Sequence, residues 1–509
     1  MPEYISRSGK RDSRRPGRLT NGSGPRRPVN KPPADPRTVA YDVTSRVSAS
    51  DSFVNLLLPR ALAASGMDAR GRAFATELVY GTQRWRGMID AVIASAAKRR
   101  TDDIDAAVLD VLRIGAFQAL FMNVPDHAAV SKSVDLARSK AGARSAGFVN
   151  AVMHKIVARN RQEWESIAVS RIDKDQPEER LAVRYSHPAW IVKELTNAWN
   201  AAGYEPQHDA TTDPIAAMLA ADNAAPDVTL VARPGLVSRD ELIAQLPENA
   251  EHEPGRWSPY ALRVHGVNPE RLAYVRAGLA GVEDEGSQLA ALALAYAPLE
   301  GGEDSEARTD RDHTWLDMCA GPGGKTALLG ALAAQRHAVL NANEPSAHRA
   351  KLVRDNVRAL PDGTIGEVWE RDGREIGADH PDAFDRVLVD APCSGLGSLR
   401  RRPEARWRKK PEDIVELAPI QRALLNSALD ATRSGGVAAY VTCSPALDET
   451  RRIVDAVLAE RKDAERLDAV AVLRAVNPAL PLPAVPGDVQ LFEHLHGTDQ
   501  MFISLIRRR

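Results

Sequence analysis

The chain has 509 residues, of which 44% are hydrophobic and 27% charged, with three cysteines and a formal net charge of -1. This length exceeds what one hydrophobic core can organise and predicts roughly three domains. The cysteine count excludes a disulfide scaffold, no apolar run could span a membrane, and the basic N-terminus lacks the apolar segment of a secretory signal. We therefore expect a cytoplasmic protein whose charges are segregated locally.

Residues 1–37 form a basic segment rich in proline, glycine and serine. Ten lysines and arginines stand there against three acidic residues. Such a segment buries too little apolar surface to offset its ordering entropy, so we predict a disordered tail. Two roles stay open for it, a solubilising extension or an arm that holds phosphates loosely.

Residues 38–170 have the hydrophobic spacing of amphipathic helices. Apolar side chains recur three and four residues apart in two stretches, Ile104, Val108, Val111 and Leu112, then Val149, Val152, Met153 and Ile156. This period predicts an all-α bundle, and no catalytic residue stands out in it.

A charged stretch, residues 161–180, links this bundle to a mixed region. We expect residues 175–300 to form a small α+β subdomain and residues 301–313, which are polar, to be a surface loop insertion. His187 could be taken for a catalytic base. Because Pro188 and a tryptophan lie beside it, we assign His187 a structural role.

From residue 314 onward the pattern becomes strand, glycine turn, helix and strand, repeated. One strand ends near Cys319, a loop with three glycines follows, and a helix begins within a residue of Lys325. Glu344 closes the next strand. This order predicts a doubly wound α/β domain over residues 314–509, in which a ligand approaches the loop backbone and the acid binds ribose hydroxyls.

The glycine loop does not match a phosphate-binding motif. A P-loop requires a glycine five residues before Gly324, where this chain has Cys319. Pro322 lacks the N–H that a phosphate cradle would use, and the spacing is not that of a dinucleotide site. A nucleoside cofactor without phosphates remains, and S-adenosylmethionine fits this description.

Three further strand ends fall on the same edge of the predicted sheet. Asp372 follows one strand, Asp390 and Cys393 follow the next, and Cys443 follows a third. Ligands bind outside the carboxyl ends of the strands in open α/β sheets, so all three cysteines should lie there. We interpret Cys319 as a small core residue and assign functional roles to the other two. No metal-ligand spacing is present, and we expect no metal.

These segments resemble the RNA (cytosine-5) methyltransferases. The resemblance rests on DMCAGPGGKT, NEPSAHRAKLVRDN, RDG, VDAPCSGLGSLRRRPEARW and YVTCSP, in this order. Gly321, where the family often has alanine, and Glu283, where glutamine is usual, depart from the pattern.

The N-terminal region resembles a NusB-like domain. FATELVYGTQRWRGMIDAVI and GFVNAVMHKI carry this likeness, which is typical of the branch of 16S ribosomal RNA methyltransferase B. The resemblance implies a multidomain protein, with an all-α NusB-like RNA-binding domain at 38–170, a small α+β subdomain at 175–300, and a Rossmann-like S-adenosylmethionine-dependent methyltransferase domain at 314–509.

The resemblance also implies roles for the two functional cysteines. Cytosine C5 is too weak a nucleophile to take a methyl group unaided, so such enzymes add a thiolate to C6. Cys443, which matches the Thr-Cys-Ser motif, is assigned this attack, and Cys393 the later release of product. Asp390 is expected to hydrogen-bond the N3 and amine edge of the base, which stabilises charge and favours cytosine over uracil.

Cofactor contacts carry over by the same matching. Glu344 is expected on the ribose, Asp372 near the adenine and Asp390 near the methionine end. For Lys325 two readings stay open, a positioning role or a solvated helix start. The expected loop contacts are Cys319, Ala320, Gly321, Pro322, Gly323, Gly324 and Lys325.

A basic run follows the Cys393 segment. It is either a solvated charged surface or, as we predict, a grip on RNA phosphates, in which the tryptophan packs or stacks on a base. The target base must be unstacked to reach Cys443, which favours a loop or a partly assembled small subunit over duplex RNA. The residues of the run are Arg400, Arg401, Arg402, Arg406, Trp407, Arg408, Lys409 and Lys410.

The predicted function is methyl transfer to C5 of a cytosine in RNA, with 16S ribosomal RNA as the expected substrate and a monomer as the expected state. The alternatives are a non-catalytic RNA-binding or antitermination-type factor, and a methyltransferase acting on transfer RNA or another RNA. A DNA methyltransferase would use Cys393 as nucleophile and leave Cys443 unexplained. Amino-group methyltransferases are disfavoured because DAPCSG replaces their signature.

Overall fold

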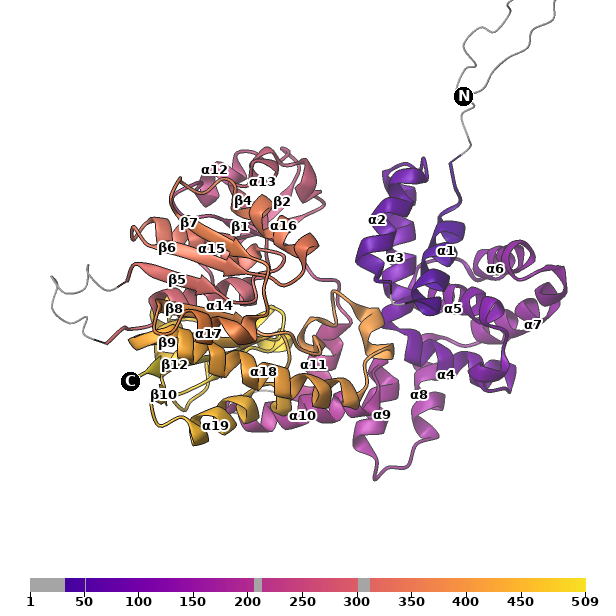
Figure 1. Ribbon diagram of the computed structural model, residues 1–509. Coiled ribbons are helices and arrows are strands. Elements are labelled where there is room, and N and C mark those ends of the chain that lie inside the picture. Colours follow the sequence, from indigo (N-terminus) through magenta and orange to yellow (C-terminus); the bar gives the residue numbers. More distant parts are fainter. Residues whose placement is uncertain (1–32, 51, 206–212, 301–311) are drawn as a thin grey trace, which may run out of the picture.

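The computed structural model describes residues 33–50, 52–205, 213–300 and 312–509. The predictions for the basic tail and the 301–313 insertion therefore fall almost entirely outside the described residues. Figure 1 shows a helical N-terminal domain on one side and a region built around a large sheet on the other. Within the described ranges, no helix combines the length and apolarity needed to cross a membrane.

The N-terminal domain is all helical, as predicted. Val149, Val152 and Ile156 are buried on one face of their helix. Ile104 lies before a helix rather than in it, because Asp105 caps that helix by accepting from two backbone N–H groups. The elements are α1 (Pro36–Ala49), α2 (Val54–Ala64), α3 (Ala69–Arg84), α4 (Arg86–Ala97), η1 (Thr101–Asp103), α5 (Ala106–Phe121), α6 (Asp126–Lys140), η2 (Ala143–Ser145) and α7 (Ala146–Val157).

The expected linker is helical as well. Asn160 forms a capping box with Glu163, which starts a helix within the charged stretch. His187 is buried 3.4 Å from Asp222, and burial lowers its pKa to about 4, consistent with the structural role assigned to it. The elements here are α8 (Arg161–Ser170), α9 (Pro177–Tyr185), α10 (Ala189–Ala202) and α11 (Pro214–Asp222).

A small α+β subdomain follows. Its antiparallel sheet has the order β2-β3-β1-β4, and a long helix after β4 leaves it to pack on the catalytic sheet. The elements are β1 (Val228–Ala232), α12 (Arg239–Ile243), β2 (Glu251–Pro254), β3 (Ala261–His265), η3 (Pro269–Arg271), α13 (Ala273–Ala277), β4 (Ala280–Val282) and α14 (Glu285–Tyr296).

The catalytic domain has a mixed sheet of order β10-β12-β9-β8-β5-β6-β7. The five strands from β9 to β7 are parallel, β12 pairs antiparallel with β9, and β10 pairs antiparallel with β12 at the edge. The strands are β5 (Thr314–Asp317), β6 (Val339–Asn343), β7 (Ile365–Trp369), β8 (Phe384–Asp390), β9 (Thr432–Thr442), β10 (Ala464–Arg466), β11 (Val489–Gln490) and β12 (Phe502–Arg508).

Helices cover both faces of this sheet, which is why its inner strands are apolar on both sides. One face packs on α14, α15 and α20, the other on α17, α18 and α19. The strand order reverses between β5 and β8, and such a switch point is where α/β sheets bind ligands. The remaining elements are α15 (Gly324–Ala334), α16 (Ala347–Val357), η4 (Gly373–Glu375), α17 (Ile376–Asp379), η5 (Leu396–Ser398), η6 (Pro403–Trp407), α18 (Pro411–Ala431), η7 (Leu447–Glu449), α19 (Arg451–Glu460), α20 (Ala469–Val476) and α21 (Glu493–His496).

Candidate active site at the carboxyl edge of the sheet

The glycine loop between β5 and α15 lies tightly against the end of β6. A Cβ on Gly321 would come within 2.2 Å of the Glu344 carboxylate, and one on Gly323 within 2.9 Å of the Val353 Cα. Gly323 also has φ +105°, a conformation that side-chain-bearing residues rarely adopt. Both glycines are therefore required for the loop to lie beside Glu344.

Two acidic residues brace this loop. Glu344 is buried after β6, accepts from the backbone N–H of Ser346 at 3.0 Å and lies 3.4 Å from Arg349. Asp317, at the end of β5, accepts from the hydroxyl of Thr326 at 2.7 Å, and burial raises its pKa to about 7. The sequence reasoning missed Asp317, although an acid that directly precedes the loop was a signal for it.

Asp372 lies beyond β7 and is already engaged. It caps η4 by accepting from the backbone N–H of Arg374, and its carboxylate also pairs with that side chain at 2.5 Å. The side chain of Asp372 is 38% exposed. It could therefore accept from a ligand only by sharing its oxygens with Arg374.

Lys325 lies inside the site, so the solvated-helix-start reading is wrong. Its side chain is 13% exposed and its Nζ donates to Oδ2 of Asp390 at 2.8 Å. Burial lowers the pKa of Lys325, but Asp390 and Glu283 raise it more, so the net shift is upward. A cation is thus held at the end of β8.

The two cysteines that follow β8 and β9 lie at the carboxyl edge of the sheet and are in direct contact there. Cys393 Sγ and Cys443 Sγ are 3.3 Å apart. The hydrogen bond between the two sulfur atoms lowers the pKa of Cys443 and raises the pKa of Cys393. Lys325 also lowers the pKa of Cys443, whereas Asp390 raises it. The pair therefore favours a thiolate on Cys443 and a thiol on Cys393.

Cys319 lies at the same edge, but in a different environment. It packs against the apolar cluster beneath the sheet, and burial raises its pKa well above the usual range. An apolar thiol is the form expected of a core residue, which agrees with the role assigned to Cys319.

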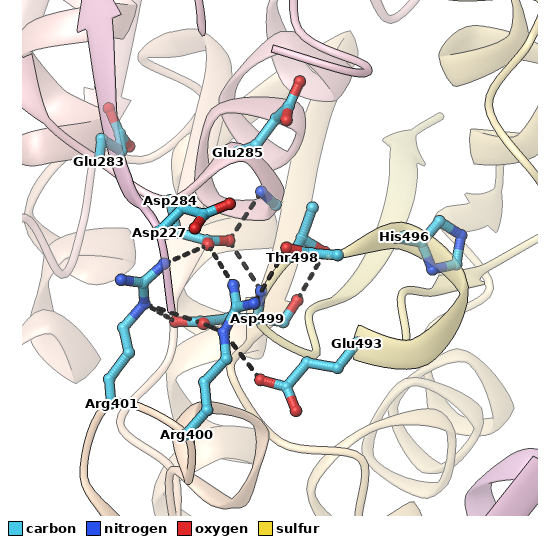
Figure 2. A network of polar contacts seen from close by, with 12 residues as sticks. Asp227, Glu283, Asp284, Glu285, Arg400, Arg401, Glu493, His496, Thr498 and Asp499 are labelled. Carbon is cyan, nitrogen blue, oxygen red and sulfur yellow. Dashed lines mark hydrogen bonds and ion pairs between the residues drawn. The ribbon is translucent and has the colours of Figure 1, made fainter. Parts of the chain in front are cut away.

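The basic run does not form one RNA-facing surface. Arg400 and Arg401 point toward Asp284 and Asp499 in a buried network (Figure 2). Arg400 Nη2 and Arg401 Nη2 donate to Asp284 at 2.9 and 2.7 Å, and both Nε groups donate to Asp499 at 2.8 and 2.9 Å. The prediction that these two arginines hold phosphates is wrong, because their guanidinium groups are used inside the protein.

The middle of the run joins the catalytic domain to the N-terminal helices. Arg406 is 0% exposed and donates to the backbone carbonyls of Arg84 at 3.1 Å and Asp222 at 2.7 Å. Trp407 has the first of its two predicted roles, packing within the protein. Its Nε1 donates to the backbone carbonyl of Gln83 at 3.1 Å. Arg408 donates to backbone carbonyls at residues 50 and 52. The phosphate-binding prediction is therefore wrong for Arg406 and Arg408 as well.

Three basic residues of the run remain available. Arg402 and Lys410 are exposed, and Lys409 lies 3.9 Å from Asp413. The guanidinium of Arg402 also lies 5.8 Å from the ring of Phe53. The RNA-binding prediction is retained for Arg402, Lys409 and Lys410 only.

Two acidic residues of the buried network in Figure 2, Glu493 and Asp284, should contribute differently to the free energy of unfolding. Glu493 Oε1 lies 2.8 Å from Arg400 Nε in this network, and burial, followed by the neighbouring Asp222, raises the pKa of Glu493. Because the charged form of Glu493 is disfavoured there, Glu493→Gln, which keeps an oxygen that can accept from Arg400, should change the free energy of unfolding by less than about 1 kcal/mol. Asp284→Asn removes the negative charge that Arg400 and Arg401 share, and it should lower the free energy of unfolding by about 3–5 kcal/mol. Urea unfolding at neutral pH measures both, and equal losses would contradict this assignment.

Comparisons with known proteins agree with this architecture. Residues 307–507 match the family model of the 16S rRNA methyltransferases RsmB/F, and residues 34–158 match that of the NusB family. A Mycobacterium tuberculosis protein described as a methyltransferase is 45% identical over 489 residues, which cover 95% of this chain and 98% of that protein.

Two further comparisons extend this likeness. The ribosomal RNA small subunit methyltransferase B of Klebsiella pneumoniae is 29% identical over 92% of this chain and 97% of its own length. The crystal structure of PH0851 has a TM-score of 0.71 and 20% identity over 93% of this chain and 99% of that one, which shows a shared fold. This chain belongs to the RsmB/F family of methyltransferases, with a NusB domain joined to a Rossmann-like catalytic domain, and its cofactor is S-adenosylmethionine.

Proposed function

We propose that this protein methylates C5 of a cytosine in 16S ribosomal RNA through a covalent adduct between Cys443 and C6 of the base. The observation that carries the proposal is the pair of sulfur atoms 3.3 Å apart at the carboxyl edge of the sheet. An amino-group methyltransferase needs no thiol there. The Klebsiella pneumoniae relative is named for the small ribosomal subunit RNA, which supports this substrate.

The residues beside the glycine loop fit a nucleoside cofactor. Gly321 has no Cβ, so the Glu344 carboxylate lies directly against the loop, where it can accept from ribose hydroxyls. In this proposal the loop residues 319–325, Glu344, Asp372 and Asp390 hold S-adenosylmethionine, which supplies the methyl group.

The chain's own residues account for the activation of cytosine. The Cys443 thiolate forms a bond to C6, the C5–C6 double bond breaks, and its electron pair becomes available at C5 for the methyl group. Lys325 engages Oδ2 of Asp390, which leaves Oδ1 to accept from the cytosine amine and orient the base. A base then takes up the C5 proton, the C–H electron pair restores the C5–C6 double bond, and the sulfur–C6 bond breaks with its electron pair returning to Cys443 as the thiolate. Cys393, as the neighbouring thiol, serves this release.

Replacing Glu344 tests the cofactor assignment. Glu344→Ala removes the carboxylate that is proposed to accept from the ribose hydroxyls, so S-adenosylmethionine affinity should fall by about 1–3 kcal/mol. Isothermal titration calorimetry measures this loss. Glu367→Ala, on the exposed side of β7, is the matched control and should bind as the wild type does. Unchanged affinity in Glu344→Ala would remove the residue from the cofactor site.

The three available residues of the basic run give a test of RNA binding. Replacing Arg402, Lys409 and Lys410 with alanine should weaken RNA binding and reduce the slope of log K against log salt by about 0.7–0.9 per lost phosphate contact. Lys462→Ala, an exposed lysine after α19, should leave the slope unchanged. Filter binding at several salt concentrations measures the slopes, and equal slopes for the triple variant and wild type would make this run a solvated surface.

Bisulfite sequencing of ribosomal RNA tests the substrate. RNA from a strain that lacks the gene should lose one protected cytosine in the 16S molecule, and the wild-type gene should restore it. An unchanged 16S pattern together with a lost 5-methylcytosine in transfer RNA would replace the substrate while keeping the chemistry. No loss in any RNA would contradict the proposal.

A further inference from the structure

Glu449 is a buried carboxylate that touches both cysteine-bearing loops. It ends η7, and its exposed fraction is 0%. Its Oε1 accepts from the backbone N–H of Ser394 at 2.7 Å, and its Oε2 accepts from the hydroxyls of Ser444 at 2.6 Å and of Ser394. Ser394 directly follows Cys393, and Ser444 directly follows Cys443. One carboxylate thus joins the two residues that come after the thiols.

Neighbouring elements hold Glu449 in place. Gln421 of α18 donates to Oε1 at 3.2 Å and to the carbonyl of Pro392 at 2.9 Å. Tyr440 of β9 donates to the backbone carbonyl of Glu449 at 2.9 Å. Each carboxylate oxygen therefore has two neutral donors. A buried charge is tolerated only with such a set of donors, which ties the loops that carry them to one arrangement.

We propose that Glu449 is a positioning residue that fixes Cys393 against Cys443 and keeps the two thiols chemically unequal. The hydrogen bond to Cys443 and burial raise the pKa of Cys393, and the charge of Glu449 raises it further. With the carboxylate present, Cys393 retains its proton and donates it toward Cys443. The proposed function enters only through the use of these thiols in catalysis, because their spacing and inequality are properties of the protein alone.

The first test needs neither RNA nor cofactor. In wild-type protein, iodoacetamide should modify Cys443 in preference to Cys393, and peptide mass spectrometry gives the ratio. Glu449→Gln keeps the size of the side chain but removes its charge and sets an amide N–H against donors. The ratio should fall about tenfold or more, since one pKa unit is a tenfold change in thiolate population. The Ser394→Ala, Ser444→Ala double variant keeps the carboxylate, loses both hydroxyl links and should shift the ratio in the same direction.

A matched control separates positioning from general stability. Asp385 is a second buried carboxylate. It lies near the start of β8, at the end of that strand opposite to the cysteine loop, and accepts from the backbone N–H groups of His313 and Thr314. Asp385→Asn should lower the melting temperature and leave the alkylation ratio at the wild-type value. Unchanged ratios in Glu449→Gln and in the double serine variant would overturn the inference.

The second test uses RNA and S-adenosylmethionine with the complete protein. Glu449→Gln should accumulate a protein–RNA adduct on denaturing gels, because Cys393 is no longer held where release requires it, and Asp385→Asn should accumulate none. A shifted alkylation ratio with no adduct in Glu449→Gln, when Cys393→Ala does form one, would overturn the link to release. A shifted ratio with no adduct in any variant, Cys393→Ala included, would support the positioning role and contradict the proposed reaction.

Discussion

Cys443→Ala is expected to lower the rate of RNA methylation by about a thousandfold or more, because no other thiolate is placed to activate the cytosine ring. Among the cysteines, Cys443 alone has its pKa lowered, chiefly by its hydrogen bond with Cys393. Incorporation of radiolabelled methyl groups into RNA under single-turnover conditions measures this loss. Activity within tenfold of wild type would exclude Cys443 as the nucleophile.

The control for this variant is cofactor binding. The Cys443 side chain is not among the residues assigned to S-adenosylmethionine, so calorimetry should give the wild-type affinity. The loss would then be assigned to chemistry rather than to a missing cofactor.

Cys393→Ala is expected to trap the enzyme on its RNA. This variant still has the Cys443 thiol, so attack and methyl transfer can proceed, but the group assigned to release is gone. A protein–RNA band that survives denaturing electrophoresis should appear, at a yield approaching one RNA per protein. The Cys393→Ala, Cys443→Ala double variant should lose this band.

Cys393→Ala should also shift the pH range over which the protein–RNA adduct forms. The hydrogen bond from Cys393 is the largest cause of the lowered Cys443 pKa, so Cys443 in the Cys393→Ala variant should ionise at higher pH. The sign follows directly, since removing a donor to the thiolate disfavours the charged form. Adduct formation in this variant should therefore rise with pH over a higher range than alkylation of Cys443 in wild-type protein. A band in Cys443→Ala and none in Cys393→Ala would reverse the two roles.

The convergence of the site residues could be predicted from the sequence. Strand, glycine loop and helix follow in a local order, and parallel strands end at one edge, so the sequence predicts that Glu344, Asp390, Cys393 and Cys443 lie at that edge of the sheet. The helical N-terminal domain followed from the 3.6-residue period of its apolar side chains. Both inferences depend only on local pattern and on chirality rules that hold across folds.

The partners of the arginines in the basic run could not be predicted from the local sequence pattern. Arg400 and Arg401 are neutralised by Asp284 and Asp499, which lie about a hundred residues away on either side in the sequence. Arg406 is buried by contacts to Arg84 in another domain. A run of positive charge looks the same in sequence whether its counter-charges are phosphates or distant carboxylates.

Glu449 shows the same limit within the active site. It stands six residues after Cys443 in the sequence. Its hydrogen-bond partner Ser394, however, lies in the loop that follows a different strand, β8. Lys325 likewise acquires its role from Asp390, which ends a different strand. The sequence identifies such side chains as polar residues near a motif, and only the folded arrangement pairs them.

The most direct measurement maps the covalent bond between protein and RNA. RNA that carries 5-fluorocytosine at the target position should hold the enzyme after methyl transfer, because fluorine on C5 cannot leave as a proton does. Trypsin and nuclease digestion of the complex followed by mass spectrometry then locates the nucleotide. The account predicts the label on Cys443 in peptide 434–451. A label on Cys393 in peptide 387–400, or no covalent complex at all, would contradict it.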